Sequence, residues 1–334
     1  MKQLYLYIAM MCLGAVALHG QQDPMFTKYM FNSLTFNPAY AGSKPYLSAG
    51  VLYRQQWFGG DAIEGAPITQ TFTIHTPISD KVGLGMSLVN DEIGPTHTVQ
   101  GNFSYAYHIP FETGKLSVAL QAGVKHWRAN WNELNPRELN DAAFENMTPS
   151  EWMPNFGAGV YYYTDNWYIG ASVPQLINYD LRETETITTN RWAQTYRHYY
   201  LTAGLVVPVN NYIDFKPSIL VKHVNLFGSF NSDPGVVSTV GAPTAVDIDA
   251  SFLFYKTIWV GAAFRSALEA LNGDSSVSSA NVWAMWYFDN GVRLGAAYDY
   301  GLNQIQTVSN GSFEVALGYD FNVDVNKVVT PRYF

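Results

Sequence analysis

The sequence has little charge, almost no cysteine and no long apolar stretch after its first twenty residues. Only 14% of its 334 residues are charged, compared with roughly 25% in a typical soluble domain. A single cysteine excludes a disulfide within the chain and a site built from several cysteines. No window after residue 20 holds 18 consecutive apolar residues, so we expect no transmembrane helix there. The net charge of −8, without a basic cluster, argues against nucleic acid as a partner.

Residues 1–20 have the features of a secretory signal peptide. Lys2 precedes an apolar run over residues 4–18, and Gly20 supplies a small residue at the expected cleavage site. Cys12 lies inside this run and would be removed with it. We therefore expect a mature chain that begins near Gln21 and contains no thiol.

Apolar and polar residues alternate through the remaining chain, and this period of two predicts β-strands. Phe103 and Tyr105, for example, alternate with Asn102 and Ser104. The same pattern predicts fourteen strands, near residues 47–57, 68–78, 82–91, 98–109, 116–126, 155–164, 167–173, 199–209, 213–222, 245–255, 258–265, 281–288, 292–301 and 312–321.

The two faces of these strands differ in charge. The apolar face carries no Asp, Glu, Lys or Arg, whereas the opposite face carries thirteen, namely Arg54, Asp91, Lys125, Asp214, Lys216, Lys222, Asp247, Asp249, Arg265, Arg293, Asp299, Glu314 and Asp320. A Lys or Arg facing lipid at the middle of a bilayer costs roughly 2–4 kcal/mol, but a lumen tolerates it. The pattern favours a membrane barrel, although a soluble β-sandwich also keeps charge on one face.

The connections distinguish these two architectures. Links after the even-numbered strands are short, whereas most links after the odd-numbered strands are long, as at 127–154, 174–198 and 223–244. Transmembrane barrels combine short periplasmic turns with long extracellular loops. We therefore predict an all-β, transmembrane antiparallel barrel of about 14 strands.

Small residues recur on the inward phase and predict a roomy lumen, since fourteen strands enclose more space than eight. They include Gly83, Gly85, Gly157, Gly159, Gly170, Gly204 and Gly295. We divide the chain into a signal peptide (1–20), an N-terminal segment (21–46), a barrel (47–321) and a C-terminal tail (322–334). The sequence leaves open whether residues 21–46 enter the lumen or lie in the periplasm.

No motif indicates catalysis, a cofactor or a metal. Asp247, Asp249 and Ser251 share one face of a strand, and we interpret them as polar lumen wall, because calcium loops need a turn rather than an extended strand. The six histidines of the mature chain lack metal-ligand spacing. We expect no cofactor, no metal and no enzymatic activity; a hydrolase assembled from distant Ser, His and Asp is an alternative.

The predicted loop 127–154 is rich in aromatic and methionine residues, which are typical of protein-binding surfaces. They are Trp127, Trp131, Phe144, Met147, Trp152 and Met153. The alternative is that this loop folds back and packs the same side chains over the barrel mouth.

Several separated motifs occur in a characteristic order. Asn37-Pro38-Ala39-Tyr40-Ala41-Gly42 precedes Tyr53-Arg54-Gln55-Gln56-Trp57 and Ala66-Pro67, and the segments 155–177, 216–222, 311–321 and the terminal PRYF follow. This set resembles the PorP/SprF family of outer-membrane proteins, which belongs to the type IX secretion and gliding machinery of Bacteroidetes. The match covers essentially the whole mature chain.

The resemblance implies a barrel without catalysis in the outer membrane of a Gram-negative bacterium. SprF-like members are associated with secretion or surface attachment of adhesins that carry a conserved C-terminal domain. PorP is linked to periplasmic motor-ring partners and a peptidoglycan-binding lipoprotein. Such partners would have to meet the short turns or residues 21–46, whose apolar surface includes Phe26, Tyr29, Phe31, Phe36 and Tyr40.

We therefore expect a barrel, surrounded by outer-membrane lipid, that binds a secreted adhesin through its extracellular loops or lumen mouth and helps to export or anchor it. A porin or transporter for small or apolar solutes is the alternative.

Overall fold

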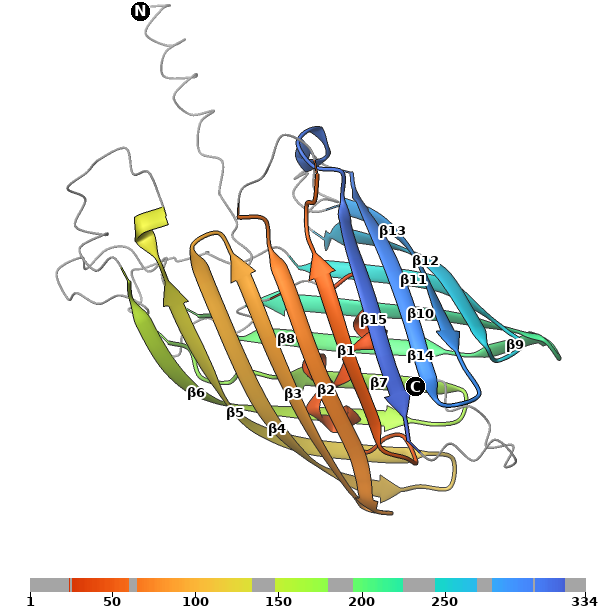
Figure 1. Cartoon of the computed structure of the whole chain (residues 1–334). Helices are drawn as coiled ribbons and strands as arrows, with labels where there is room; N and C mark the ends of the chain where they lie inside the picture. Colours follow the sequence, from red (N-terminus) through yellow and green to blue (C-terminus); the bar gives the residue numbers. More distant parts are fainter. Residues whose placement is uncertain are drawn as a thin grey trace, which may run out of the picture.

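The computed structural model describes residues 24, 26–59, 65–133, 148–179, 195–224, 244–268, 278–302 and 304–321. One antiparallel sheet closes into a barrel (Figure 1). Its strands are β1 (Ser48–Gln55), β2 (Ile68–Ser79), β3 (Val82–Ile93), β4 (Thr96–Pro110), β5 (Lys115–Ala129), β6 (Ser150–Tyr163), β7 (Trp167–Val173), β8 (His198–Leu205), β9 (Val207–Asn210), β10 (Ile213–Val224), β11 (Ala245–Phe254), β12 (Ile258–Ala267), β13 (Ser278–Tyr287), β14 (Val292–Gly301) and β15 (Ser312–Asp320).

The barrel closes where its first strand meets its last. β1 pairs with β15 from Ser48 opposite Asp320 to Gln55 opposite Phe313. β8 and β9 both pair with β10 and are separated only by Val206, so together they form one transmembrane strand. The predicted 14-strand antiparallel barrel is thereby confirmed.

The outer and inner faces of the wall have the predicted polarity. On β4, Phe103 is 69% exposed, while the adjacent Asn102 is 5% exposed. Ten of the thirteen charged residues assigned to the inward phase are buried: Arg54, Asp91, Asp214, Lys216, Asp247, Asp249, Arg265, Asp299, Glu314 and Asp320. The apolar outer face is the surface that contacts lipid in a transmembrane barrel.

The two ends of the barrel differ in their connections. Links such as 80–81 and 211–212 are short, whereas 130–149, 174–197 and 225–244 are long. Since long loops are extracellular in transmembrane barrels, the end that carries them is called the extracellular end here, and the other the periplasmic end. β5 and β6 extend further than the sequence indicated, which reduces the predicted loop 127–154 to residues 130–149.

The helices in the described part of the chain are all short. η1 (Tyr29–Phe31), α2 (Ser33–Phe36) and η2 (Pro38–Tyr40) precede β1 and lie inside the barrel, whereas η3 (Trp131–Glu133) follows β5 and η6 (Gln304–Thr307) precedes β15 (Figure 1). In the described ranges, no helix is long and apolar enough to cross a membrane.

Candidate functional site: a plugged lumen and its extracellular rim

Residues 26–46 fill the lumen and are called the plug. Phe26, Tyr29 and Phe36 are at most 6% exposed and pack against the wall residues Leu52 and Tyr200. The rings of Phe36 and Tyr200 meet edge to face, with centroids 5.2 Å apart. A second apolar cluster joins the plug to strands β4–β7 through Leu34, Ala39, Ala41, Ala106, Ala119, Tyr161, Tyr163 and Tyr168.

The lumen, rather than the periplasm, is therefore where the structure places this segment. Of the aromatic residues considered for a periplasmic partner, Phe26, Tyr29 and Phe36 are buried, and Phe31 and Tyr40 are half-buried. Because these rings pack against the barrel wall, they do not form a periplasmic docking surface.

The plug passes through the lumen from one end to the other. Phe26 accepts a hydrogen bond from Arg265, near the extracellular end of β12. Lys44 pairs with Asp320, the last residue of β15, at the periplasmic end. The chain thus runs from the extracellular to the periplasmic end of the lumen before it enters the wall as β1.

Buried ion pairs fix the extracellular half of the plug to the wall. Nζ of Lys28 lies 2.6 Å from Oδ2 of Asp249, which also accepts a hydrogen bond from Nε1 of Trp283 at 2.8 Å. Burial lowers the pKa of Lys28, and the Asp249 carboxylate opposes that shift. Buried charges have to be paired in this way, because an isolated ion loses its hydration.

The same network continues around the lumen. Arg54 pairs with Glu314 at 3.0 Å and with Asp299 at 3.5 Å, and Arg265 pairs with Asp247 at 2.6 Å. Glu314 also accepts hydrogen bonds from the backbone N–H groups of Thr27 and Lys28. We call this set the ionic clamp: Lys28, Arg54, Asp247, Asp249, Arg265, Asp299 and Glu314.

Asp247 and Asp249 thus serve as ion-pair partners in the lumen wall. Ser251, on the same face of β11, donates a hydrogen bond to the carbonyl of Lys216 at 2.8 Å. Over the described ranges, the side chains include no group of His, Cys, Asp and Glu able to hold a metal ion.

The inward glycines of the wall accommodate the plug. A Cβ atom built at Gly83 would lie 2.8 Å from Cα of Gly42, and one at Gly295 would lie 3.1 Å from the Phe31 ring. At Gly159 it would overlap the side-chain oxygen of Asn37. At these three positions, plug atoms occupy the space that the missing side chains leave.

The family-like motif in the plug forms a turn that fits the wall. Asn37 caps η2 by accepting a hydrogen bond from the backbone two residues ahead at 3.0 Å, and Pro38 is the first residue of η2. Tyr40 meets His75 edge to face at 5.2 Å, and the backbone N–H of Gly42 donates to Nδ1 of His75 at 3.2 Å. Gly42 has φ of +71°, a conformation that disfavours any side chain.

The second family-like motif organises the extracellular end of β1. Arg54 enters the ionic clamp, whereas Tyr53 packs its ring against β15 on the outer face. The backbone N–H of Gln56 donates to the carbonyl of Pro67 at 2.9 Å, which holds the strand to the start of β2. Trp57 has φ of +54°, and its backbone N–H donates to Oγ of Ser312 on β15 at 3.2 Å.

The predicted partner-binding residues are divided by the structure. Trp127 and Trp131 face one another at the extracellular end, with ring centroids 6.3 Å apart. Trp152 is 65% exposed on the outer phase of β6 and stacks on His126 at 4.2 Å. Met153 is only 3% exposed, so it does not belong to an exposed loop surface. Phe144 and Met147 lie outside the described residues.

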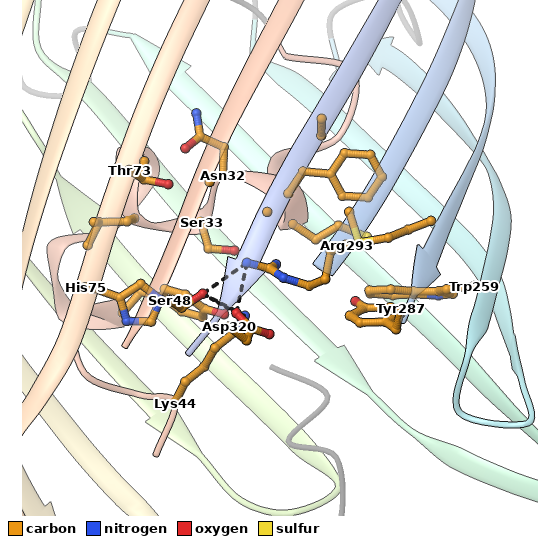
Figure 2. A pocket seen from close by; sticks show the side chains of 18 of the residues that line it. Asn32, Ser33, Lys44, Ser48, Thr73, His75, Trp259, Tyr287, Arg293 and Asp320 are labelled. Atoms are coloured by element: carbon orange, nitrogen blue, oxygen red, sulfur yellow. Dashed lines mark hydrogen bonds and ion pairs between the residues drawn. The ribbon is translucent and has the colours of Figure 1, made fainter. Parts of the chain in front are cut away.

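A cavity of about 160 Å³ remains between the plug and the periplasmic half of the wall. Figure 2 shows Lys44, Ser48, Arg293 and Asp320 gathered on one side of it. Asp320 lies 3.0 Å from Arg293 and 3.4 Å from Lys44. Burial, reinforced by the Arg293 charge, lowers the pKa of Lys44 to about 7 even though Asp320 opposes the shift.

Sequence reasoning missed both lysines of the plug, since neither belongs to a periodic segment. The sequence does, however, contain a signal for their role. Residues 24–46 contain two Lys and no acid, and the inward phase of the wall carries seven acids and six bases. A cationic segment is therefore complementary to that wall.

Solved structures similar to this one are outer-membrane barrels. The toluene transporter TbuX of Ralstonia pickettii has a TM-score of 0.52 at 9% identity, over 86% of this chain and 92% of that one. A Pseudomonas aeruginosa FadL homologue has a TM-score of 0.45 at 14% identity, over 86% and 94%. Omp33 of Acinetobacter baumannii has a TM-score of 0.45 at 10% identity, over 84% and 100%. At this identity, the likeness to TbuX supports the fold alone.

No curated protein matches the sequence. The family described as type IX secretion system membrane protein PorP/SprF, in contrast, matches residues 18–319. That family and the closed barrel together place the protein in the outer membrane. The chain therefore belongs to the PorP/SprF family of type IX secretion system membrane proteins.

Proposed function

We propose that this protein is a non-enzymatic barrel of the type IX secretion machinery that binds a secreted surface adhesin at its extracellular rim and helps to export or anchor it. The plug is the observation that carries the proposal. A lumen filled by its own chain makes the barrel a scaffold in the membrane, whose accessible surfaces are its two ends. Membership of a secretion-system family connects that scaffold with exported proteins.

The plug also weakens the alternative of a diffusion channel. Porins conduct through a water-filled lumen. Here, side chains of the plug meet the wall on several sides, and the ionic clamp holds Lys28 to Asp249 at 2.6 Å. Transport of a solute would require this packed segment to move, whereas binding at the rim requires no such movement.

The extracellular rim has aromatic surface suited to a protein partner. Trp127 and Trp131 are half-buried neighbours at the end of β5, and Trp152 is largely exposed at the start of β6. Tryptophan is enriched where protein interfaces concentrate their binding energy. Residues 130–149 connect these two strands, so a partner that binds this loop lies next to the strand ends that carry these rings.

The loop between β5 and β6 provides the direct test. Replacing residues 131–148 with a short Gly-Ser linker preserves both strands, since β5 ends at Ala129 and β6 begins at Ser150. We expect the barrel to insert normally and the adhesin to be lost from the cell surface. The control is the same linker in place of residues 225–243, between β10 and β11, which should leave surface display intact.

The measurement is antibody labelling of the adhesin on intact cells, together with heat-modifiable gel mobility to verify that the barrel is folded. Unchanged display after replacement of 131–148 would refute the role of this loop. A search for bound proteins by pull-down from outer membranes would then identify partners at other surfaces. For components in the periplasm, the plug offers little surface, so we propose that they meet the short turns.

A further inference from the structure

The cavity between the plug and the periplasmic half of the wall has an excess of positive charge. Its lining includes the basic side chains of Lys44, Lys216, Lys256 and Arg293 and one carboxylate, that of Asp320. Lys44 and Arg293 both pair with this carboxylate, at 3.4 and 3.0 Å. The two basic side chains therefore share a single carboxylate, and a second anion would be stabilised between Lys44 and Arg293.

Arg293 retains hydrogen-bonding capacity for such an anion. Its Nη2 donates to Oγ of Ser48 at 3.0 Å in addition to pairing with Asp320. Among the described residues, its buried Nε has no hydrogen-bond partner, so a small rotation of the side chain would be needed to turn that donor towards a ligand. A guanidinium carries five N–H donors, whose planar arrangement matches a carboxylate. Burial, reinforced by the Arg293 charge, lowers the pKa of Lys44, and an anion bound beside it would favour its charged form.

Flat aromatic side chains form another part of the lining. Trp259 and Tyr287 stand on the other side of the cavity from Lys44 (Figure 2), with their rings 6.4 Å apart and inclined by 26°. Nζ of Lys216 lies 3.4 Å from the centre of the Trp259 ring. Such surfaces favour a planar apolar group, which gains offset or edge-to-face contacts with them.

The volume limits the size of the ligand. The cavity measures about 160 Å³, and an apolar cavity of about 150 Å³ is large enough to bind benzene. A single ring with a short substituent therefore fits, whereas a lipid chain or an oligosaccharide does not.

We propose that this cavity binds a carboxylate attached to one aromatic ring, with the carboxylate between Arg293 and Lys44 and the ring towards Tyr287 and Trp259. Two sources share this chemistry: a free aromatic acid, and the C-terminal aromatic residue of a polypeptide. The site lies at the periplasmic end and is separate from the extracellular rim. The proposal for this site can therefore be tested independently of adhesin binding.

Calorimetric titration of the purified mature barrel in detergent tests the proposal. Phenylacetate is the probe, and phenylacetamide, its neutral counterpart, is the control. We expect phenylacetate to bind at least about tenfold more tightly than the amide, because hydrogen bonds to an ion are the stronger kind. Equal binding of acid and amide, or no binding of the acid, would overturn the proposal.

Two substitutions at one glycine separate the cavity from other sites on the protein. Gly50 lines the cavity, and a Cβ there would make only ordinary contacts, 3.6 Å from Oγ1 of Thr73. Gly50→Ala should bind phenylacetate within about twofold of the unmodified protein, whereas Gly50→Leu should fill the cavity and weaken binding by about tenfold or more. Thermal unfolding of both variants verifies that they are folded, and equal binding by Gly50→Leu and Gly50→Ala would contradict the assigned site.

A second pair of variants tests whether the positive charge of Arg293 contributes to binding. Arg293→Gln should weaken phenylacetate binding by about tenfold or more, and Lys222→Gln, at the extracellular end of β10, should leave it unchanged. An effect of equal size in the two variants would contradict the proposed contact.

N-acetylphenylalanine and its C-terminal amide distinguish the two sources. Tight binding of N-acetylphenylalanine, but not of its amide, would identify a polypeptide C-terminus. Binding of phenylacetate alone would identify a free acid.

Discussion

Replacing Gly83 with alanine would place a methyl group against the backbone of the plug. Gly83 lies on the inward phase of β3, and a Cβ there would stand 2.8 Å from the carbonyl carbon of Ala41 and from Cα of Gly42. Both are backbone atoms of a buried turn and cannot rotate away as a flexible side chain would. The plug and the wall therefore have to separate locally.

The expected magnitude follows from packing. Forcing an extra carbon atom into a well-packed interior costs typically about 1–3 kcal/mol. Alanine by itself would act in the opposite direction, since replacing glycine reduces the freedom of the unfolded chain and stabilises by about 0.4–1 kcal/mol where the backbone permits. We expect Gly83→Ala to lower the free energy of unfolding by about 1–2 kcal/mol.

Gly50→Ala is the matched control. It makes the same chemical change on the inward phase of β1, but its Cβ would have ordinary contacts at 3.6 and 3.8 Å. We expect this variant to be as stable as the unmodified barrel or slightly more stable. Urea unfolding in detergent micelles, followed by tryptophan fluorescence, gives both values. If Gly83→Ala were as stable as Gly50→Ala, the plug would not pack against β3 as described.

Two further changes test the interactions of the plug lysines. Lys28→Met leaves Asp249 buried without its cation and should destabilise the barrel by about 3–5 kcal/mol, whereas Lys28→Met combined with Asp249→Asn should recover part of that loss. Urea unfolding measures both, and equal stability of the single and double variants would contradict the buried pair. Lys44 has a pKa of about 7 in the folded protein, below its ordinary value. As pH rises above 7, the folded protein therefore loses this proton while the unfolded chain still keeps it. Stability should therefore increase between about pH 7 and 10, by at most about 1.4 kcal/mol per pH unit. Lys44→Met should lack this increase; an identical pH profile for both proteins would refute the assignment.

The strands of the wall could be predicted because lipid on the outside and the polar lumen on the inside restrict which residue types can occupy alternate positions. Lipid requires apolar side chains such as Phe103 and Tyr105 on the outer face, and the lumen accepts polar ones such as Asn102 and Ser104 on the inner face. Apolar and polar residues therefore alternate along the sequence with a period of two. This constraint ends where the strands leave the bilayer. β6 begins at Ser150, beyond the apolar alternation, so the sequence pattern places Met153 in a loop, whereas in the structure it faces inward on β6.

The plug was not predictable in the same way. Its position depends on contacts between distant parts of the chain, as between Lys28 and Asp249, and on no local period. The inward glycines carried the relevant signal, but a glycine such as Gly83 marks a close approach without revealing which segment approaches. Only the folded arrangement shows that the approaching segment is the family-like motif around Asn37 and Gly42.

The closed lumen is the central claim, and electrical conductance tests it most directly. The mature protein would be inserted into a planar lipid bilayer, with insertion verified independently by recovery of the folded barrel from the membrane. Since residues 26–46 fill the barrel, the membrane current should remain at its baseline after insertion. A steady, stepwise conductance of the kind that open porins produce would contradict the plugged lumen and restore the channel alternative.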